Sequence, residues 1–372
     1  MEKIENPDGS YAIWHESNGQ KYLEVYAFNH YDLGFLESKF LSKKIHIFKE
    51  LIEILALKHI SKRHTYQKFI SMAQEYEKFI PSYLRQEMQG MADALENISY
   101  EDILLQNCFL DILYGQLIPM NNYDLALHSY DFGCTSFGVI NQNSTLTGQN
   151  FDLAAIFKPT LTFTLIKMPN KPDIFSLRTG ALLSLPVGRN SHGVALSVTV
   201  IKNRMKGAIS IPCSIKARIA FETGNNAETL YNFMISTPSS TSGTLLIADE
   251  SKIIALEILP SKYKREDVKN TVVRSNTFIS NSLQDYLIKP KYSKKRQRYA
   301  EKQLNEVYNN NYKGLTDDGL LNLLADHPII CRMKYRRSKT IAFNTKLYFG
   351  LGNPNQNKPG TIPFNQMNEA LK

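Results

Sequence analysis

The chain has 372 residues and a net charge of +9, with 43% hydrophobic and 21% charged residues. This composition is ordinary for a globular protein, and the length suits two domains or one large one. The first ten residues lack the basic and apolar segments of a secretory signal, and no apolar run reaches the about 18 residues of a spanning helix. We therefore expect a cytoplasmic protein without a membrane span.

Two strands and a helical block open the chain. Aromatic and β-branched residues within 10–26, on either side of the turn sequence Ser17–Gln20, predict two short strands. From about residue 35 to 118 the apolar residues recur at helical spacing, with Pro81 and Gly90 as punctuation. Ser99, followed by Asp102, resembles a capped helix start.

Strands dominate after residue 131. Helical spacing returns over 215–233, 297–308 and 315–324. Strands in two groups with helices between them suggest an α+β or a layered α/β/β/α architecture. β-branched and aromatic residues predict strands over 135–139, 146–151, 161–167, 194–200, 244–248, 253–258 and 340–349.

The basic stretch Lys289–Arg298 is the main source of local positive charge. We interpret it as a solvated helix face or loop. Clustered cations also bind nucleic acids by releasing counterions, but no recognisable nucleic-acid-binding module surrounds this stretch. Nucleic acid is therefore not an expected partner, although the sequence pI near 9.1 keeps that class as a rival.

The four cysteines, Cys108, Cys134, Cys213 and Cys331, form no CxxC pair, so a zinc or redox motif is absent. In a cytosolic protein they should be free thiols, and free cysteines are usually small buried hydrophobes. The common phosphate-, dinucleotide-, zinc- and serine-hydrolase motifs are also missing. We expect no metal and no required cofactor.

Cys134 follows Gly133 at the start of a predicted strand, which suggests self-cleavage. Glycine has no Cβ, so its carbonyl can be approached closely. Attack by the thiol on the Gly133 carbonyl, followed by hydrolysis, would free Cys134 as a new N-terminus. An α-amine has a pKa of about 7.7–8.0 and a thiol about 8.5, so the amine could serve as base for its own thiol. The alternative is a buried cysteine that opens a strand.

Further motifs follow Cys134 in a fixed order. Gly148-Gln-Asn-Phe-Asp152 resembles Gly-Gln-Asn-Trp-Asp, and Arg274-Ser-Asn-Thr-Phe278 resembles His-x-Asn-His-Phe without its histidines. With Gly133-Cys-Thr135, Asn190–Val194 and Ile330-Cys-Arg332, the set resembles the isopenicillin N acyltransferase family over about residues 30–355. These are N-terminal-nucleophile acyltransferases and linear amide hydrolases.

The resemblance implies a four-layer αββα sandwich of two antiparallel sheets between helical layers. Residues 1–133 would be a pro-segment, or α-chain, that stays bound after cleavage. Residues 134–372 would be the catalytic β-chain, and the resulting α/β heterodimer would form one composite domain.

The resemblance also assigns roles to residues. Cys134 would be the nucleophile, Asp152 would hold its ammonium, and Asn276 would donate to the oxyanion. Arg332 would bind a carboxylate or brace Asp152, or else lie on the surface. Asn150 and His192 are further candidates for the substrate pocket.

The expected function is a self-processed amide hydrolase or acyltransferase. It would act on a linear N-acyl amide or peptide-like substrate through a thioester acyl-enzyme, with an acyl-coenzyme A as an alternative donor. Two rivals stay open: an unprocessed, inactive binding protein of the same fold, and a nucleic-acid-associated protein. The intact mass of the purified chain separates the first rival from an enzyme.

Overall fold

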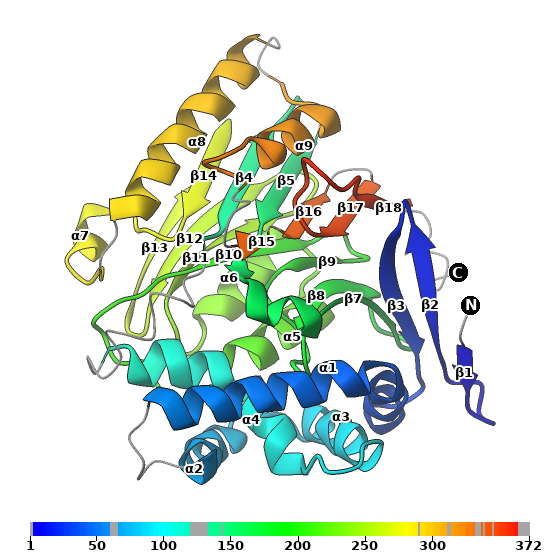
Figure 1. Ribbon diagram of the computed structural model, residues 1–372. Helices are drawn as coiled ribbons and strands as arrows, with labels where there is room; N and C mark the ends of the chain where they lie inside the picture. Colours follow the sequence, from blue (N-terminus) through cyan, green and yellow to red (C-terminus); the bar gives the residue numbers. More distant parts are fainter. Residues whose placement is uncertain are drawn as a thin grey trace.

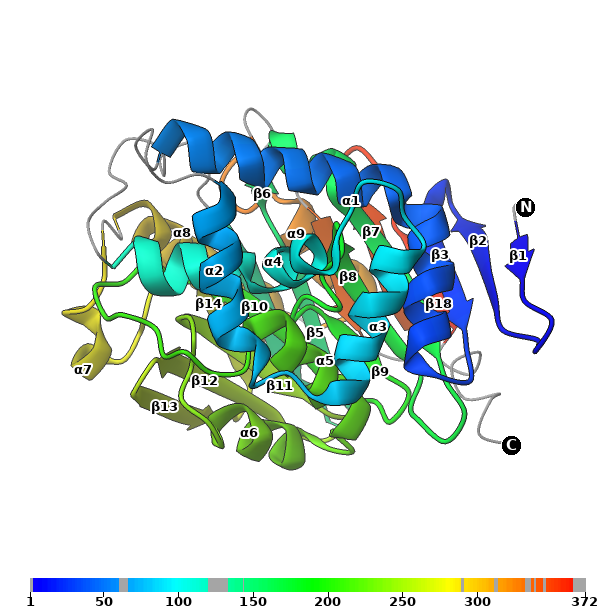
Figure 2. The same cartoon turned by 90° about the horizontal axis from the view of Figure 1, so that it is seen from below.

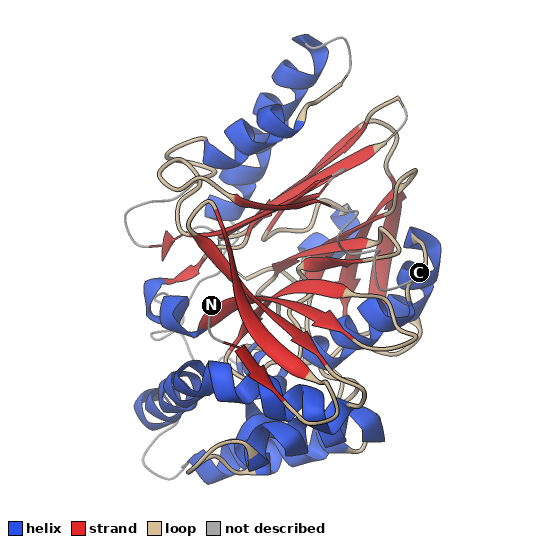
Figure 3. Cartoon of the chain, turned by 90° about the vertical axis from the view of Figure 1, so that its right-hand side faces the viewer, coloured by secondary structure: helices blue, strands red, loops and turns tan. Residues whose placement is uncertain are grey.

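Four layers of secondary structure stack in the order helix, sheet, sheet, helix, from bottom to top in Figure 1. Figure 3 shows the two sheets in red between helices in blue. The α+β sandwich expected from the sequence is therefore confirmed. The computed structural model describes residues 3–59, 66–119, 133–142, 144–288, 291–310, 314–331, 336–337, 339–343 and 346–363.

The larger sheet has ten strands and is antiparallel except where β3 and β7 pair in parallel, with Tyr22 opposite Phe163. A parallel pair needs a long crossover, and residues 27–160 provide it here. The expectation of antiparallel sheets is thus right apart from this pair. In spatial order the strands are β1 (Lys3–Glu5), β2 (Tyr11–Ser17), β3 (Gln20–Tyr26), β7 (Leu161–Lys167), β8 (Ile174–Thr179), β9 (Gly188–Asn190), β10 (Ala195–Val200), β11 (Gly243–Ala248), β12 (Ile253–Leu259) and β13 (Lys262–Asp267).

The smaller sheet has six strands and packs face to face on the larger one. Phe349 from this sheet packs its ring 5.3 Å from the rings of Phe163 and Phe175 on the other, which is aromatic contact distance. β15 (Arg336–Arg337) and β6 (Leu153–Ala154) form a separate ribbon. In spatial order the six strands are β14 (Thr271–Ser275), β4 (Thr135–Ile140), β5 (Thr145–Asn150), β16 (Lys339–Phe343), β17 (Lys346–Leu351) and β18 (Gly360–Pro363).

Helices cover both outer faces of the sandwich. Figure 2, from below, shows the helices that cover the ten-stranded sheet. Within the described residues, no helix is both long enough and apolar enough to cross a membrane. That layer holds α1 (His30–His59), α2 (Tyr66–Glu77), α3 (Ser82–Asp93), α4 (Tyr100–Leu110), the π-helix η1 (Asp111–Leu117), α5 (Cys213–Thr223) and α6 (Ala227–Ile235); α8 (Lys291–Asn310) and α9 (Asp317–Ala325) cover the six-stranded sheet, and the short η2 (Ala155–Thr160) and α7 (Asn281–Gln284) lie in connections.

Two glycines let α1 and α3 touch through their backbones. A Cβ on Gly34 would lie 2.0 Å from the carbonyl oxygen of Glu87, and one on Gly90 would lie 2.0 Å from that of Tyr31. No real side chain fits at such distances, so only glycine permits this approach. Gly90 is therefore an interior residue of α3, whereas the sequence suggested that it would punctuate the helical block.

Several sequence predictions need correction. The single helix expected over 215–233 is two helices, because Asn226 caps α6 through its side chain just after α5 ends. The single strand expected over 340–349 is the hairpin β16–β17. β8, β13 and β14 are among the strands that were not predicted, and the charged, exposed β13 has no apolar alternation to reveal it. The N-terminal hairpin and the Ser99 capping box are confirmed.

Candidate active site

Strand register brings the three predicted catalytic residues to one edge of the six-stranded sheet. Thr135 on β4 pairs with Asn150 on β5 and with Ser275 on β14. One step beyond these pairs, Cys134 faces Asn276 on one side, and Gly133 donates its amide to the carbonyl of Asp152 at 3.2 Å on the other. Residues far apart in the sequence therefore meet where three strands begin or end.

Arg296, from α8, holds Asn276 beside Cys134. Its Nη2 donates to Oδ1 of Asn276 at 2.5 Å and to the carbonyl oxygen of Cys134 at 3.1 Å. Nδ2 of Asn276 donates to the carbonyl oxygen of Val200 at 2.7 Å. Because a guanidinium only donates hydrogen bonds, Arg296 fixes which end of the Asn276 amide carries the oxygen. The Asn276 N–H end is thereby available to the sulfur of Cys134.

The environment of Cys134 keeps its thiol protonated in the intact chain. Burial, helped by the negative charge of Asp152, raises the pKa of this thiol to about 12. The Asp152 backbone amide, the Arg296 charge and the Asn276 side chain act in the opposite direction, because each stabilises a thiolate. The cluster thus contains groups that favour the sulfur anion but do not outweigh its burial.

Two of the other predicted site residues, Asn150 and His192, do not join this cluster. The side chain of Asn150 donates to the carbonyl of Leu324 at 2.7 Å, at the end of α9 on the helix-covered face of the sheet. His192 is exposed in the turn between β9 and β10, whereas Val200, which contacts Asn276, lies at the far end of β10. Arg332 lies outside the described residues.

Arg296 is a site residue that the sequence interpretation missed. It belongs to the stretch Lys289–Arg298, which we expected to be solvated, yet its residue is only 1% exposed. Lys291, Lys295 and Arg298 are exposed as expected. The spacing of the residues could have predicted the burial of Arg296. It is followed at four-residue spacing by the buried residues Ala300, Leu304 and Tyr308, so all four lie on one face of the helix.

A pocket with a mostly apolar lining lies near the cluster. Its wall includes Val200, whose carbonyl accepts from Asn276, and Phe151, which immediately precedes Asp152. A second apolar pocket shares Leu110, Tyr114, Phe151 and Leu185 with the first. Cys134, Asp152 and Asn276 are not among the lining residues, so the first pocket approaches the cluster through the neighbouring residues Phe151 and Val200.

An αββα sandwich with a cysteine at the start of a strand is the arrangement of the N-terminal-nucleophile hydrolases. The sequence profile described as acyl-coenzyme A:6-aminopenicillanic acid acyl-transferase matches residues 139–348, and the chain belongs to this family. The matched region contains Asp152, Asn276 and Arg296 and begins just after Cys134.

Beyond the family match, the chain shows a likeness to a solved structure. No curated protein matches it. Among solved structures, a Caenorhabditis elegans N-acylethanolamine-hydrolyzing acid amidase (NAAA) ortholog is similar, with 12% sequence identity and a TM-score of 0.46. That likeness covers 62% of this chain and 99% of the other.

Proposed function

We propose that the protein cleaves itself between Gly133 and Cys134 and then hydrolyses, or transfers the acyl group of, a linear N-acyl amide. The observation that carries the proposal is the meeting of Cys134, Asp152 and Asn276 at one edge of the six-stranded sheet, with a largely apolar pocket nearby. Membership of an acyltransferase family supports the same reaction class.

Self-cleavage would begin with the thiol of Cys134 and the peptide bond before it. The sulfur attacks the Gly133 carbonyl carbon, a C–S bond forms, the C–N bond breaks, and the thiol proton passes to the departing amine. Water then hydrolyses the thioester, which leaves a carboxylate on Gly133 and a free amine on Cys134. The hydrogen bond from the Gly133 amide to Asp152 would hold the scissile segment in place during these steps.

Turnover would use the amine that cleavage creates. The amine takes the proton of its own thiol, and the thiolate attacks the substrate carbonyl. Asn276 donates to the oxyanion, Arg296 holds the Asn276 amide in position, and Asp152 holds the ammonium. The ammonium returns its proton to the leaving amine, and the thioester acyl-enzyme passes its acyl group to water or to another amine.

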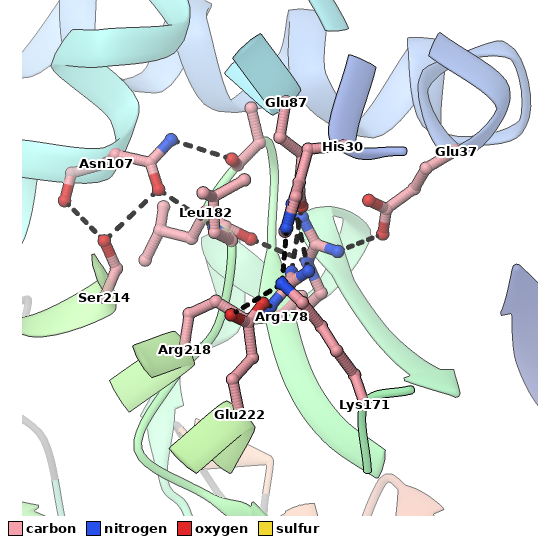
Figure 4. A network of polar contacts seen from close by, with 12 residues as sticks. His30, Glu37, Glu87, Asn107, Lys171, Arg178, Leu182, Ser214, Arg218 and Glu222 are labelled. Atoms are coloured by element: carbon pink, nitrogen blue, oxygen red, sulfur yellow. Dashed lines mark hydrogen bonds and ion pairs between the residues drawn. The ribbon is translucent and has the colours of Figure 1, made fainter. Parts of the chain in front are cut away.

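Segment 1–133 would remain bound after cleavage, because buried ion pairs join it to the rest of the chain. Arg218 donates to both carboxylate oxygens of Glu87 at 2.8 and 2.9 Å, and Arg178 pairs with Glu37. All four side chains are fully buried. The acids come from before the cleavage site and the arginines from after it, as Figure 4 shows. Separating the two pieces would expose these charges unpaired.

Intact mass under denaturing conditions tests the proposal. The purified wild-type chain should give fragments Met1–Gly133 and Cys134–Lys372, and N-terminal sequencing of the larger one should read Cys-Thr-Ser-Phe-Gly. The Cys134→Ala chain should stay whole under identical incubation. A wild-type chain that remains single after prolonged incubation, and hydrolyses no N-acyl amide, is instead the inactive binding protein.

A further inference from the structure

The backbone turns sharply at Asn276, so the direction of this side chain depends on the chain on either side of it. The amide of Thr277 donates to the carbonyl oxygen of Ser275 at 2.7 Å, which closes a three-residue turn centred on Asn276. Before the turn, β14 is held by its pairing with β4. After the turn the chain leaves the sheet toward α7, so contacts outside this sheet must fix its position.

Glu257, on β12 of the ten-stranded sheet, holds the chain that follows Asn276. One oxygen of its carboxylate accepts from the amide of Ile279, and the other accepts from the amide of Ser280 at 3.0 Å. Glu257 is only 2% exposed, and a hydrogen bond from a backbone amide to a charged acceptor is stronger than one to a neutral acceptor. The segment is therefore anchored three and four residues beyond Asn276.

Glu257 belongs to a row of polar side chains across three strands of the ten-stranded sheet. Thr199 on β10 pairs with Thr244 on β11, and Thr244 pairs with Glu257 on β12, so the three side chains lie on one face. The hydroxyl of Thr199 lies 2.5 Å from that of Thr244 and donates to the carbonyl oxygen of Ser275 at 2.8 Å. The row thus holds the backbone just before Asn276 through Thr199 and just after it through Glu257.

The contact at Glu257 needs a carboxylate and not a neutral amide. The amides of Ile279 and Ser280 both point at this side chain, and a carboxylate accepts at both of its oxygens. A glutamine of nearly the same size has one accepting oxygen and one donating nitrogen. It would therefore hold one of the two amides and oppose the other.

Resting on the proposed function, we propose that Glu257 is a positioning residue for the oxyanion donor. Arg296 fixes the oxygen end of the Asn276 amide, and Glu257 fixes the backbone that carries Asn276. Glu257 acts through Asn276 and not on the substrate. Its loss should therefore lower the rate of the reaction more than the affinity for the substrate.

Glu257→Gln tests the assignment with little change in side-chain size. We expect kcat for an N-acyl amide to fall about 10–100-fold, as for a misplaced catalytic group, with a smaller change in the Michaelis constant. Asp249→Asn is the matched control. Asp249 lies in the turn that joins β11 to β12, and its carboxylate also accepts three backbone amides, but it does not contact the segment 275–280. It should leave kcat unchanged. A folded Glu257→Gln enzyme with wild-type kcat would overturn the proposal.

A double-mutant cycle separates action through Asn276 from a general loss of structure. In the Asn276→Leu chain the donor is already absent, so adding Glu257→Gln should lower kcat no further. If Glu257 contributes only to structure, Glu257→Gln lowers kcat by the same factor in both backgrounds, and that result contradicts the assignment. If Glu257→Gln does not fold, Glu257→Asp replaces it in the cycle with the same expectation, because it keeps the charge and shortens the reach by one methylene.

Hydrogen exchange in the Cys134→Ala chain tests the contact without any turnover. Glu257→Gln should remove protection from the amides of Ile279 and Ser280, whereas Asp249→Asn should not. Unchanged exchange at both amides would overturn the inference. Failure of the proposed function gives a different result: a wild-type chain that neither cleaves itself nor hydrolyses an N-acyl amide refutes the enzyme, even if Glu257 protects both amides. An active enzyme with wild-type kcat in Glu257→Gln does the reverse.

Discussion

This protein has two buried polar clusters that both contain charged side chains. The two clusters differ in what these side chains contact. In the cluster between α1 and the ten-stranded sheet, every acid that Figure 4 labels contacts an arginine: Glu87 and Glu222 contact Arg218, and Glu37 contacts Arg178. In the cluster at Cys134, by contrast, the Asn276 amide, the Arg296 guanidinium and the Asp152 backbone amide converge on one residue. The first cluster pairs acids with bases, whereas the second surrounds the sulfur of the proposed nucleophile.

The pKa values follow this difference. Burial by itself would raise the pKa of Glu87, but Arg218 and His30 outweigh it and hold the value at about 2. At Cys134 burial dominates and the pKa stands at about 12. Burial raises the pKa of Glu37 despite its pairing with Arg178, so Glu87, which has both Arg218 and His30 beside it, is the carboxyl of this cluster whose pKa is lowered. The Cys134 thiol, with weaker partners, stays neutral. Substitutions should therefore separate stability from activity.

Cys134→Ala should give the largest effect, because it removes the nucleophile of both reactions. We expect complete loss of cleavage and of amide turnover, measured by intact mass and by product release, with an unchanged melting temperature to within a few degrees. Cys108→Ala is the control, since Cys108 is equally buried but lies in α4 near Ala73. Activity that survives in Cys134→Ala would show that another residue is the nucleophile.

Glu87→Gln should affect stability alone. Loss of one partner leaves Arg218 buried and without its full counter-charge, which costs about 3–5 kcal/mol in the free energy of unfolding, measured by urea denaturation. Glu228→Gln is the control: Glu228 also has a pKa lowered to about 2, by Arg265, but it lies on the surface. Because exposed pairs are screened by solvent, this change should cost less than about 1 kcal/mol. Equal losses in the two variants would contradict the distinction.

The free energy of unfolding should depend on pH through Glu87 of the same cluster. A carboxyl whose pKa is lower in the folded chain than in the unfolded chain binds protons mainly after unfolding, so its stabilisation is full above the unfolded value near 4.5. The stabilisation falls as the pH drops from there toward about 2. Wild-type stability should therefore decline more steeply than that of Glu87→Gln between pH 5 and about 3, in urea titrations at each pH.

Asn276→Leu should lower kcat by about 10²–10³-fold, the usual result of losing an oxyanion donor. The Michaelis constant should change less, because the donor acts mainly on the charge that develops during attack. The measurement is steady-state kinetics on the cleaved and folded variant. Near wild-type turnover would mean that the match of residues 274–278 to the family motif is accidental.

Arg296→Gln should have a smaller effect, of about 10–100-fold on kcat, since Arg296 acts through the placement of Asn276. Arg298→Gln, two residues along the same helix but exposed, should leave kinetics unchanged. A rise in the Michaelis constant with constant kcat would instead indicate that Arg296 binds the substrate.

Sequence motifs predicted which residues belong together but not how they meet. Gly133, Cys134, Asp152 and Asn276 carry recognisable local patterns, and the register of β14, β4 and β5 brings them together. Arg296 was missed because it lies in a basic stretch, although the helix turns Arg296 and Gln297 inward.

Other misses have plain geometric causes. Asn150 lies in the motif beside Gln149, but alternate strand residues face opposite ways. Gln149 therefore bonds Val198 of the other sheet, while Asn150 bonds the end of α9. The pairing of Glu87 with Arg218 joins residues 131 positions apart, and no local pattern announces such a contact.

The contacts of Gly34 with α3 and of Gly90 with α1 have a consequence for the evolution of related sequences. Either residue, if it gained a methyl group, would push apart the two helices that carry His30 and Glu87, and so would loosen the grip on Arg218. Residues 34 and 90 should therefore be retained or replaced together. Lineages that keep the buried charges should keep both glycines, and lineages that lose one glycine should have rebuilt the helix crossing and the charges together.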